Sequence, residues 1–181
     1  MAHEEVKPDN QSNFGCTPLN YAAGHGHVEI VKILFTRAEV DPDKQNNHCC
    51  TPLSTTAQYG HEDVVKILLA REEVNPENLD SDGDTPFACA AIDGREGVVK
   101  ILLEQEGVNP DRPNHTGQTP LASAAANGHE GVVRILLEQE EVNPDRADND
   151  GKTPFMLAAT HGYQRVIELL QPRKVVSHGR L

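Results

Sequence analysis

The feature that most constrains this chain is a Thr-Pro pair that returns every 34 residues, at Thr17, Thr51, Thr85, Thr119 and Thr153. A fixed period of this size is typical of repeat proteins, in which each unit packs only against its neighbours. The period therefore predicts one quasi-linear domain of five units over residues 5–171, followed by a C-terminal tail at 172–181.

Each unit carries the signals of two short helices. The Thr hydroxyl can cap a helix, and Pro is well tolerated at the first helical position. In the fourth unit, apolar positions such as Leu121 and Ala124 form one stripe, and Gly128 is expected to end the helix. A second helix is expected from about Glu130, with Leu136 in its apolar block. The glycine that ends the first helix recurs as Gly26, Gly60, Gly94 and Gly162.

The connection that leads into each Thr-Pro pair has its own turn signal. A glycine stands two residues before Thr in four units, at Gly15, Gly83, Gly117 and Gly151. The second unit has Cys49 there instead. Because glycine adopts left-handed turns without steric cost, we expect the second loop to be strained or differently shaped.

These motifs resemble the ankyrin repeat family. The resemblance rests on Thr-Pro-Leu at 17–19, 51–53 and 119–121, on Ala-Ala and Gly-His near the helix turn, and on Val-Asn after the second helix. It implies an all-α solenoid of five stacked helix-turn-helix repeats joined by β-hairpin-like loops. The 34-residue variant repeat also resembles the ankyrin arrays of filamentous fungi. The repeat is one residue longer than the family's usual 33.

Composition excludes several function classes. The net charge of −12 at pH 7 argues against nucleic acid, which attracts a basic surface. No apolar run approaches the ~20 residues of a membrane span, and the polar start of the chain does not resemble a signal peptide. Four cysteines without paired spacing favour the cytoplasm, with the nucleus left open.

No catalytic arrangement is evident. The chain has no Gly-rich phosphate loop, no CxxC and no HExxH, so we expect neither an enzyme nor a bound cofactor or metal. His27, His61 and His129 share one repeat position and are expected to bond backbone at the helix turn. His48 with Cys49 and Cys50 leaves open a chance metal or oxidation site.

The family resemblance places partner binding on the loop tips and on the concave face of the first helices. Those positions are among the least repeated of the chain, and their aromatic and large apolar candidates cluster in the first three units. The expected binding residues are Phe14, Cys16, His25, His48, Cys50, Gln58, Tyr59, Asp82, Asp84, Ile92 and Asp93. The expected partner is a protein of unknown identity, bound by a monomer. Two alternatives stay open: sequence drift at solvent positions, and a spacer within a larger fungal immune-receptor-like protein.

Two further expectations concern charge. Glu62 with Lys66, and Glu96 with Lys100, are spaced for ion pairs on the outer face of the second helices. Arg165 and Glu168 give the last helix a polar character that suits a C-terminal cap.

Overall fold

The computed structural model describes residues 7–171, which form ten helices arranged as five consecutive pairs. The expected tail at 172–181 and the first two residues of the expected domain lie outside this range. The first helices of the pairs are α1 (Pro18–Gly24), α3 (Pro52–Tyr59), α5 (Pro86–Ile92), α7 (Pro120–Ala126) and α9 (Pro154–His161). The second helices are α2 (Val28–Leu34), α4 (Glu62–Leu69), α6 (Glu96–Leu103), α8 (Glu130–Leu137) and α10 (Gln164–Leu170).

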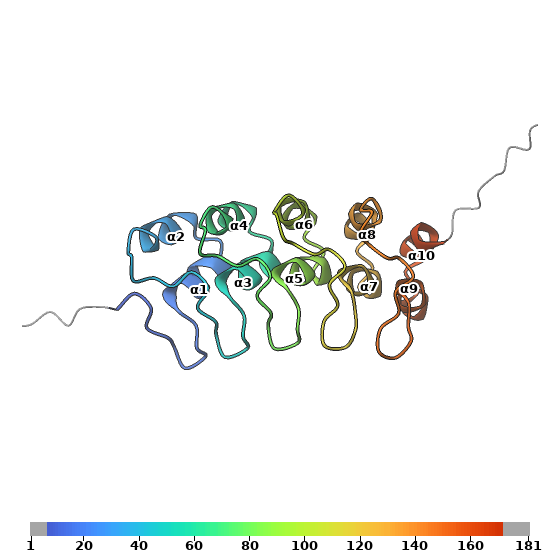
Figure 1. Ribbon diagram of the computed structural model, residues 1–181, viewed down its shortest axis with the longest axis horizontal. Coiled ribbons are helices and arrows are strands. Elements are labelled where there is room, and N and C mark those ends of the chain that lie inside the picture. The colour runs from blue at the N-terminus through green and yellow to red at the C-terminus, as the bar shows by residue number, and fades with distance from the viewer. Residues whose placement is uncertain (1–6, 172–181) are drawn as a thin grey trace, which may run out of the picture.

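The pairs stand side by side in a row, with all loops projecting in the same direction (Figure 1). Each first helix packs on the next first helix, and each second helix on the next second helix. The helical solenoid expected from the period is therefore confirmed. None of the helices in residues 7–171 combines the length and the apolar character that a bilayer crossing needs.

The expected helix signals act as predicted. Thr17, Thr51 and their equivalents are N-caps with extended backbone, and the Thr51 hydroxyl accepts a hydrogen bond from the Ser54 N–H at 3.1 Å. Pro fills the first turn of all five first helices. Gly60 ends α3 in the left-handed conformation, with φ of +83°. Local residue types therefore set where the first helices begin and end.

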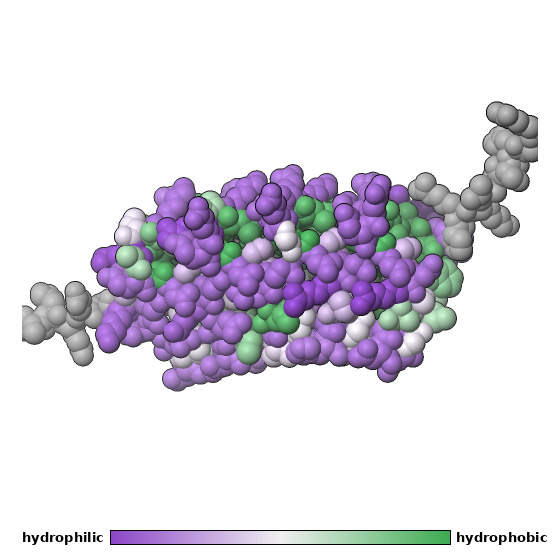
Figure 2. All heavy atoms as spheres, in the orientation of Figure 1, coloured by the Kyte–Doolittle hydropathy of each residue, from purple (hydrophilic) through white to green (hydrophobic). Residues whose placement is uncertain are grey.

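The core is a row of equivalent side chains rather than one central cluster. Leu53 of α3 and Phe87 of α5 are fully buried against their neighbours, and so are Val65, Leu68 and Leu136 of the second helices. The small residues Ala57, Ala91 and Ala125 allow the first helices to approach closely. On the face shown in Figure 2, hydrophilic residues cover most of the surface, and hydrophobic surface appears mainly between the second helices.

The loops are tight turns, with no strand within residues 7–171. The Gly15 N–H donates to Ser12 O at 2.8 Å, and the Cys49 N–H donates to Asn46 O at 3.0 Å, so the second loop keeps the common shape. Cys49 adopts a strained backbone conformation in this turn, with φ of +59°, the one positive value at a non-glycine residue in the described range. The strained alternative of the sequence-based prediction is confirmed.

The ion pairs expected on the outer face are wrong. Neither Glu62 with Lys66 nor Glu96 with Lys100 forms a salt bridge within the described residues. Glu62 instead lies against Gly97 of the next unit, so closely that a side chain at Gly97 would collide with its carboxylate. Contact with the neighbouring unit replaces contact along the helix.

Candidate protein-binding surface

A hollow of about 550 Å³ lies between the first and second units, and we call it the aromatic hollow. Tyr59 at the end of α3 leaves 54% of its surface exposed there, and Tyr21 of α1 leaves 46%. A methyl group added at Gly24 would reach van der Waals contact with the Tyr59 ring, so the glycine leaves the hollow open there. The lining is completed by Cys16, Asn20, His25, Asn46, Thr55 and His61.

Two hydrogen bonds fix the imidazoles of the aromatic hollow. His61 Nε2 is 3.1 Å from Gly24 O of the preceding unit, and His25 Nδ1 is 2.9 Å from Tyr21 O. The Tyr59 and His61 rings are tilted against each other, with centroids 6.5 Å apart. The histidine expected at the helix turn thus bonds backbone, but the carbonyl belongs to the neighbouring unit. His129 repeats this contact with Ile92 O at 2.8 Å.

A second hollow of about 320 Å³ lies between the third and fourth units at partly equivalent positions, and we call it the acidic hollow. Asp82, Asp84 and Ile92 line it together with Asn114 and His115. Asp84 differs from the exposed position expected for it, because only 6% of its surface is accessible. The Asn114 side-chain amide donates to Asp84 Oδ1 at 3.1 Å. Burial raises the pKa of Asp84 to about 6, despite that hydrogen bond.

The eleven expected binding residues therefore divide into three groups. Cys16, His25 and Tyr59 meet at the aromatic hollow, and Asp82, Asp84 and Ile92 meet at the acidic hollow. Phe14, His48, Cys50, Gln58 and Asp93 line neither of the two hollows. Phe14 is nevertheless the most exposed large apolar side chain in the described range, at 69%.

Sequence reasoning missed Tyr21. The signal was present, because this position reads Tyr21, Thr55, Cys89, Ser123 and Leu157 and so differs in every unit. The position is buried as Cys89, Ser123 and Leu157, and only Tyr21 is strongly exposed there.

Comparison with known proteins identifies the repeat. A family model described as Ankyrin repeats (3 copies) matches residues 1–77, 39–114 and 106–177, which together span nearly the whole chain. This chain belongs to the ankyrin repeat family. Ankyrin repeats are generally protein–protein interaction modules. No curated protein matches the chain.

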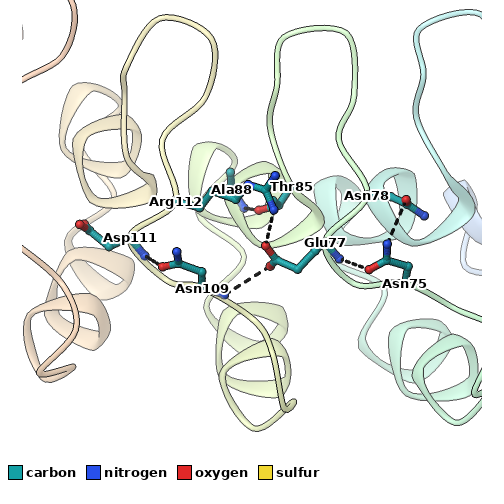
Figure 3. Close-up of polar contacts among 8 residues, drawn as sticks. All are labelled: Asn75, Glu77, Asn78, Thr85, Ala88, Asn109, Asp111 and Arg112. Atoms are coloured by element: carbon teal, nitrogen blue, oxygen red, sulfur yellow. Dashed lines mark hydrogen bonds and ion pairs between the residues drawn. The ribbon is translucent and has the colours of Figure 1, made fainter.

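The ankyrin stack also carries a polar ladder that sequence reasoning missed (Figure 3). Glu77 accepts a hydrogen bond from the Asn109 N–H at 3.3 Å and pairs with Arg112 at 2.8 Å, both in the next unit. One unit earlier, Asp43 accepts from the Asn75 N–H at 2.8 Å and from the Asn78 side chain at 2.9 Å. The next step pairs Asp111 with Arg146 at 3.1 Å. Each unit is thus tied to its neighbour by an acid and a downstream donor.

The ankyrin chain's cysteines are free thiols. Burial is the main cause that raises the pKa of Cys50 to about 11, and burial also raises the pKa of Cys89. Because the thiolate is the reactive form, both stay protonated and unreactive at neutral pH. Within residues 7–171, no group of three or more His, Cys, Asp or Glu side chains is placed to hold a metal ion.

Proposed function

We propose that this chain is a five-repeat ankyrin array that binds a protein partner through the aromatic hollow and the neighbouring loop tips. The observation that carries the proposal is the exposure of Tyr59. The other large apolar side chains exposed in residues 7–171 belong to the first or the last unit of that range, which packs against one neighbouring unit instead of two. Tyr59 lies inside the stack and is still 54% exposed. Exposed aromatic side chains of this kind are typical anchors of protein interfaces.

The acidic hollow supports a charge preference for the same partner. It shares five repeat positions with the aromatic hollow, so it opens on the same first-helix face. Asp82 is exposed there and Asp84 lies beneath it. A partner segment that places an apolar side chain against Tyr59 and a basic one near Asp82 fits both hollows. We place the interaction in the cytoplasm, in keeping with four unpaired cysteines.

Affinity capture with the whole chain as bait tests this proposal. Binding of the captured protein is then measured for the double variant Tyr59→Ala with Phe14→Ala. We expect a loss of over ~2 kcal/mol, or more than about 30-fold in Kd, because interfaces concentrate their free energy in a few aromatic anchors. Both side chains are exposed, so circular dichroism should show an unchanged fold.

The matched control is Lys66→Ala with Lys100→Ala, which changes exposed residues on α4 and α6. It should leave binding nearly intact. If the lysine pair abolishes binding and the aromatic pair does not, the partner binds the second-helix side and the proposal is wrong. Failure to capture any stoichiometric partner would favour the alternative, a spacer within a larger fungal immune-receptor-like protein.

A further inference from the structure

Within residues 7–171, the first and the last unit expose opposite faces of the stack. Ile30 in the first unit is 48% exposed, whereas its equivalents are at most 1% exposed: Val64, Val98, Val132 and Val166. Phe155 in the last unit is 37% exposed, whereas its equivalents are fully buried: Leu19, Leu53, Phe87 and Leu121. A preceding unit therefore covers the position of Ile30, and a following unit covers that of Phe155.

Met156 makes the C-terminal end more apolar than the polar cap expected from the sequence. It is 51% exposed, at a position where the preceding units hold the small buried residues Asn20, Ser54, Ala88 and Ala122. Arg165 and Glu168 are exposed on α10, and an ion pair of 3.4 Å joins them. The last unit therefore exposes polar residues on α10 and the apolar Phe155 and Met156 on α9, and hydrophobic surface is visible at the C-terminal end in Figure 2.

In the histidine contact between units, the ring comes from one unit and the carbonyl from the unit before it. Within the described residues, the first unit has such a ring without a carbonyl, and the last unit has such a carbonyl without a ring. His61 and His129 each approach a carbonyl at the end of the preceding first helix, at Gly24 and Ile92. His27 is the same residue at the same position, and its ring makes no hydrogen bond within residues 7–171. Thr160 in the last unit holds the equivalent carbonyl.

Hydrogen bonds between neighbouring loops in the described range show the same division, with an unused donor in the first unit and unused acceptors in the last. The Asn47 N–H donates to Phe14 O at 3.1 Å, and its side-chain amide donates to Asn13 O at 3.0 Å. Asn149 repeats both contacts on the fourth loop, at 3.0 and 3.1 Å. Asn13 is again the same residue at the same position, and in the described part of the chain it donates no hydrogen bond. The last loop supplies the equivalent acceptors at Asn149 O and Asp150 O.

We propose that the C-terminal end of one copy stacks on the N-terminal end of a second copy, so that the repeat stack continues from chain to chain. Ile30 and Phe155 then take the buried places of their equivalents, and His27 and Asn13 make the contacts of His61 and Asn47. The contact joins two different surfaces, so it does not close on itself, and copies add head to tail. This assembly replaces the monomer expected from the sequence, and it leaves the aromatic hollow free.

Sedimentation of the whole chain tests the proposal. The weight-average mass should rise from that of one chain toward that of two and more as the concentration rises from micromolar to millimolar. Ile30→Asp blocks only the N-terminal end, and Met156→Lys blocks only the C-terminal end. Each variant alone should stay at the mass of one chain. An equal mixture should form dimers and stop there, because one compatible junction remains.

Three outcomes would overturn the proposal. Wild-type chain that keeps the mass of one copy at all concentrations shows that the ends do not stack. Self-association of either single variant shows a contact between like ends instead. Variants that fail to complement each other in the mixture, while circular dichroism shows both folded, exclude the head-to-tail junction. Tyr59→Ala is the matched control and should assemble as wild type does, which separates this inference from the proposed partner binding.

Discussion

Interior and terminal units bury equivalent repeat positions to different extents. Leu136 in the fourth unit is fully buried, whereas its equivalent in the last unit, Leu170, is half-buried. Asp84 is buried in the third unit, and the equivalent Lys152 is exposed in the fifth. Burial in this protein is therefore a property of the junction between units. The stability of a unit should then depend on how many neighbours it has, as expected for a stack of nearest-neighbour contacts.

The largest expected effect is on the free energy of unfolding, and it should differ between Leu136→Ala and Leu170→Ala. Leu136→Ala should reduce the free energy of unfolding by ~2–5 kcal/mol, because it leaves a cavity in a closed junction. Leu170→Ala should cost clearly less, since solvent already reaches that side chain. Urea denaturation followed by circular dichroism measures both. Equal losses would show that the last unit is as well packed as the interior.

The pH dependence of stability should come from Asp84, which is buried. Lys152 stands at the equivalent position of the last unit and is exposed. The unfolded pKa of Asp84 is 3.8 and burial raises the folded pKa to about 6. Stability from this group is therefore present in full below the unfolded pKa and is lost as the pH rises through the folded pKa. Asp84→Asn should raise the Tm at pH 7 by about 2–4 °C, the range for ~1 kcal/mol in a chain of this size. The gain should shrink toward zero as the pH falls to 4.

Thermal melts of both proteins across this pH range give the measurement. Lys152→Gln is the control at the exposed terminal position, and its melting curve should follow wild type at each pH. A gain for Asp84→Asn that is constant between pH 4 and pH 7 would mean that the carboxyl is ionised in the folded state throughout.

The smallest expected effect on the free energy of unfolding is that of replacing a histidine, and it should differ between His61 and His27. His61→Ala should cost ~0.5–1.5 kcal/mol, because Gly24 O loses the ring nitrogen that lies 3.1 Å away. His27→Ala removes a ring that makes no hydrogen bond within residues 7–171, and in dilute solution it should cost close to nothing. Chemical denaturation of the two variants side by side decides the matter. A similar loss at both positions would mean that the imidazole acts within its own unit.

Local signals made the helices and turns predictable. Thr17 and Gly60 act through their own backbone and the next turn, so the sequence alone indicates the cap and the stop. The same holds for Cys49, whose positive φ follows from its place in a glycine series. The family could be recognised for the same reason, since its motifs are local and recur in phase.

What the sequence did not predict depends on the neighbouring unit. Asp84 is buried beside Asn114, which lies 30 residues away. Glu77 pairs with Arg112, which lies 35 residues away. Glu62 was expected to pair within its helix, but it turns toward Gly97 instead. Such contacts need the geometry of the stack, and no pattern within one unit contains it.

The polar ladder has a consequence for how such a chain changes over generations. The acids Asp43, Glu77 and Asp111 each face forward, and the donors Asn78, Arg112 and Arg146 each face back. A deletion or duplication of 34 residues would therefore place an acid of the series opposite a donor of the series, for example Asp43 opposite Arg112. Unequal recombination could lengthen or shorten the array by whole units while each new junction kept an acid facing a nitrogen donor.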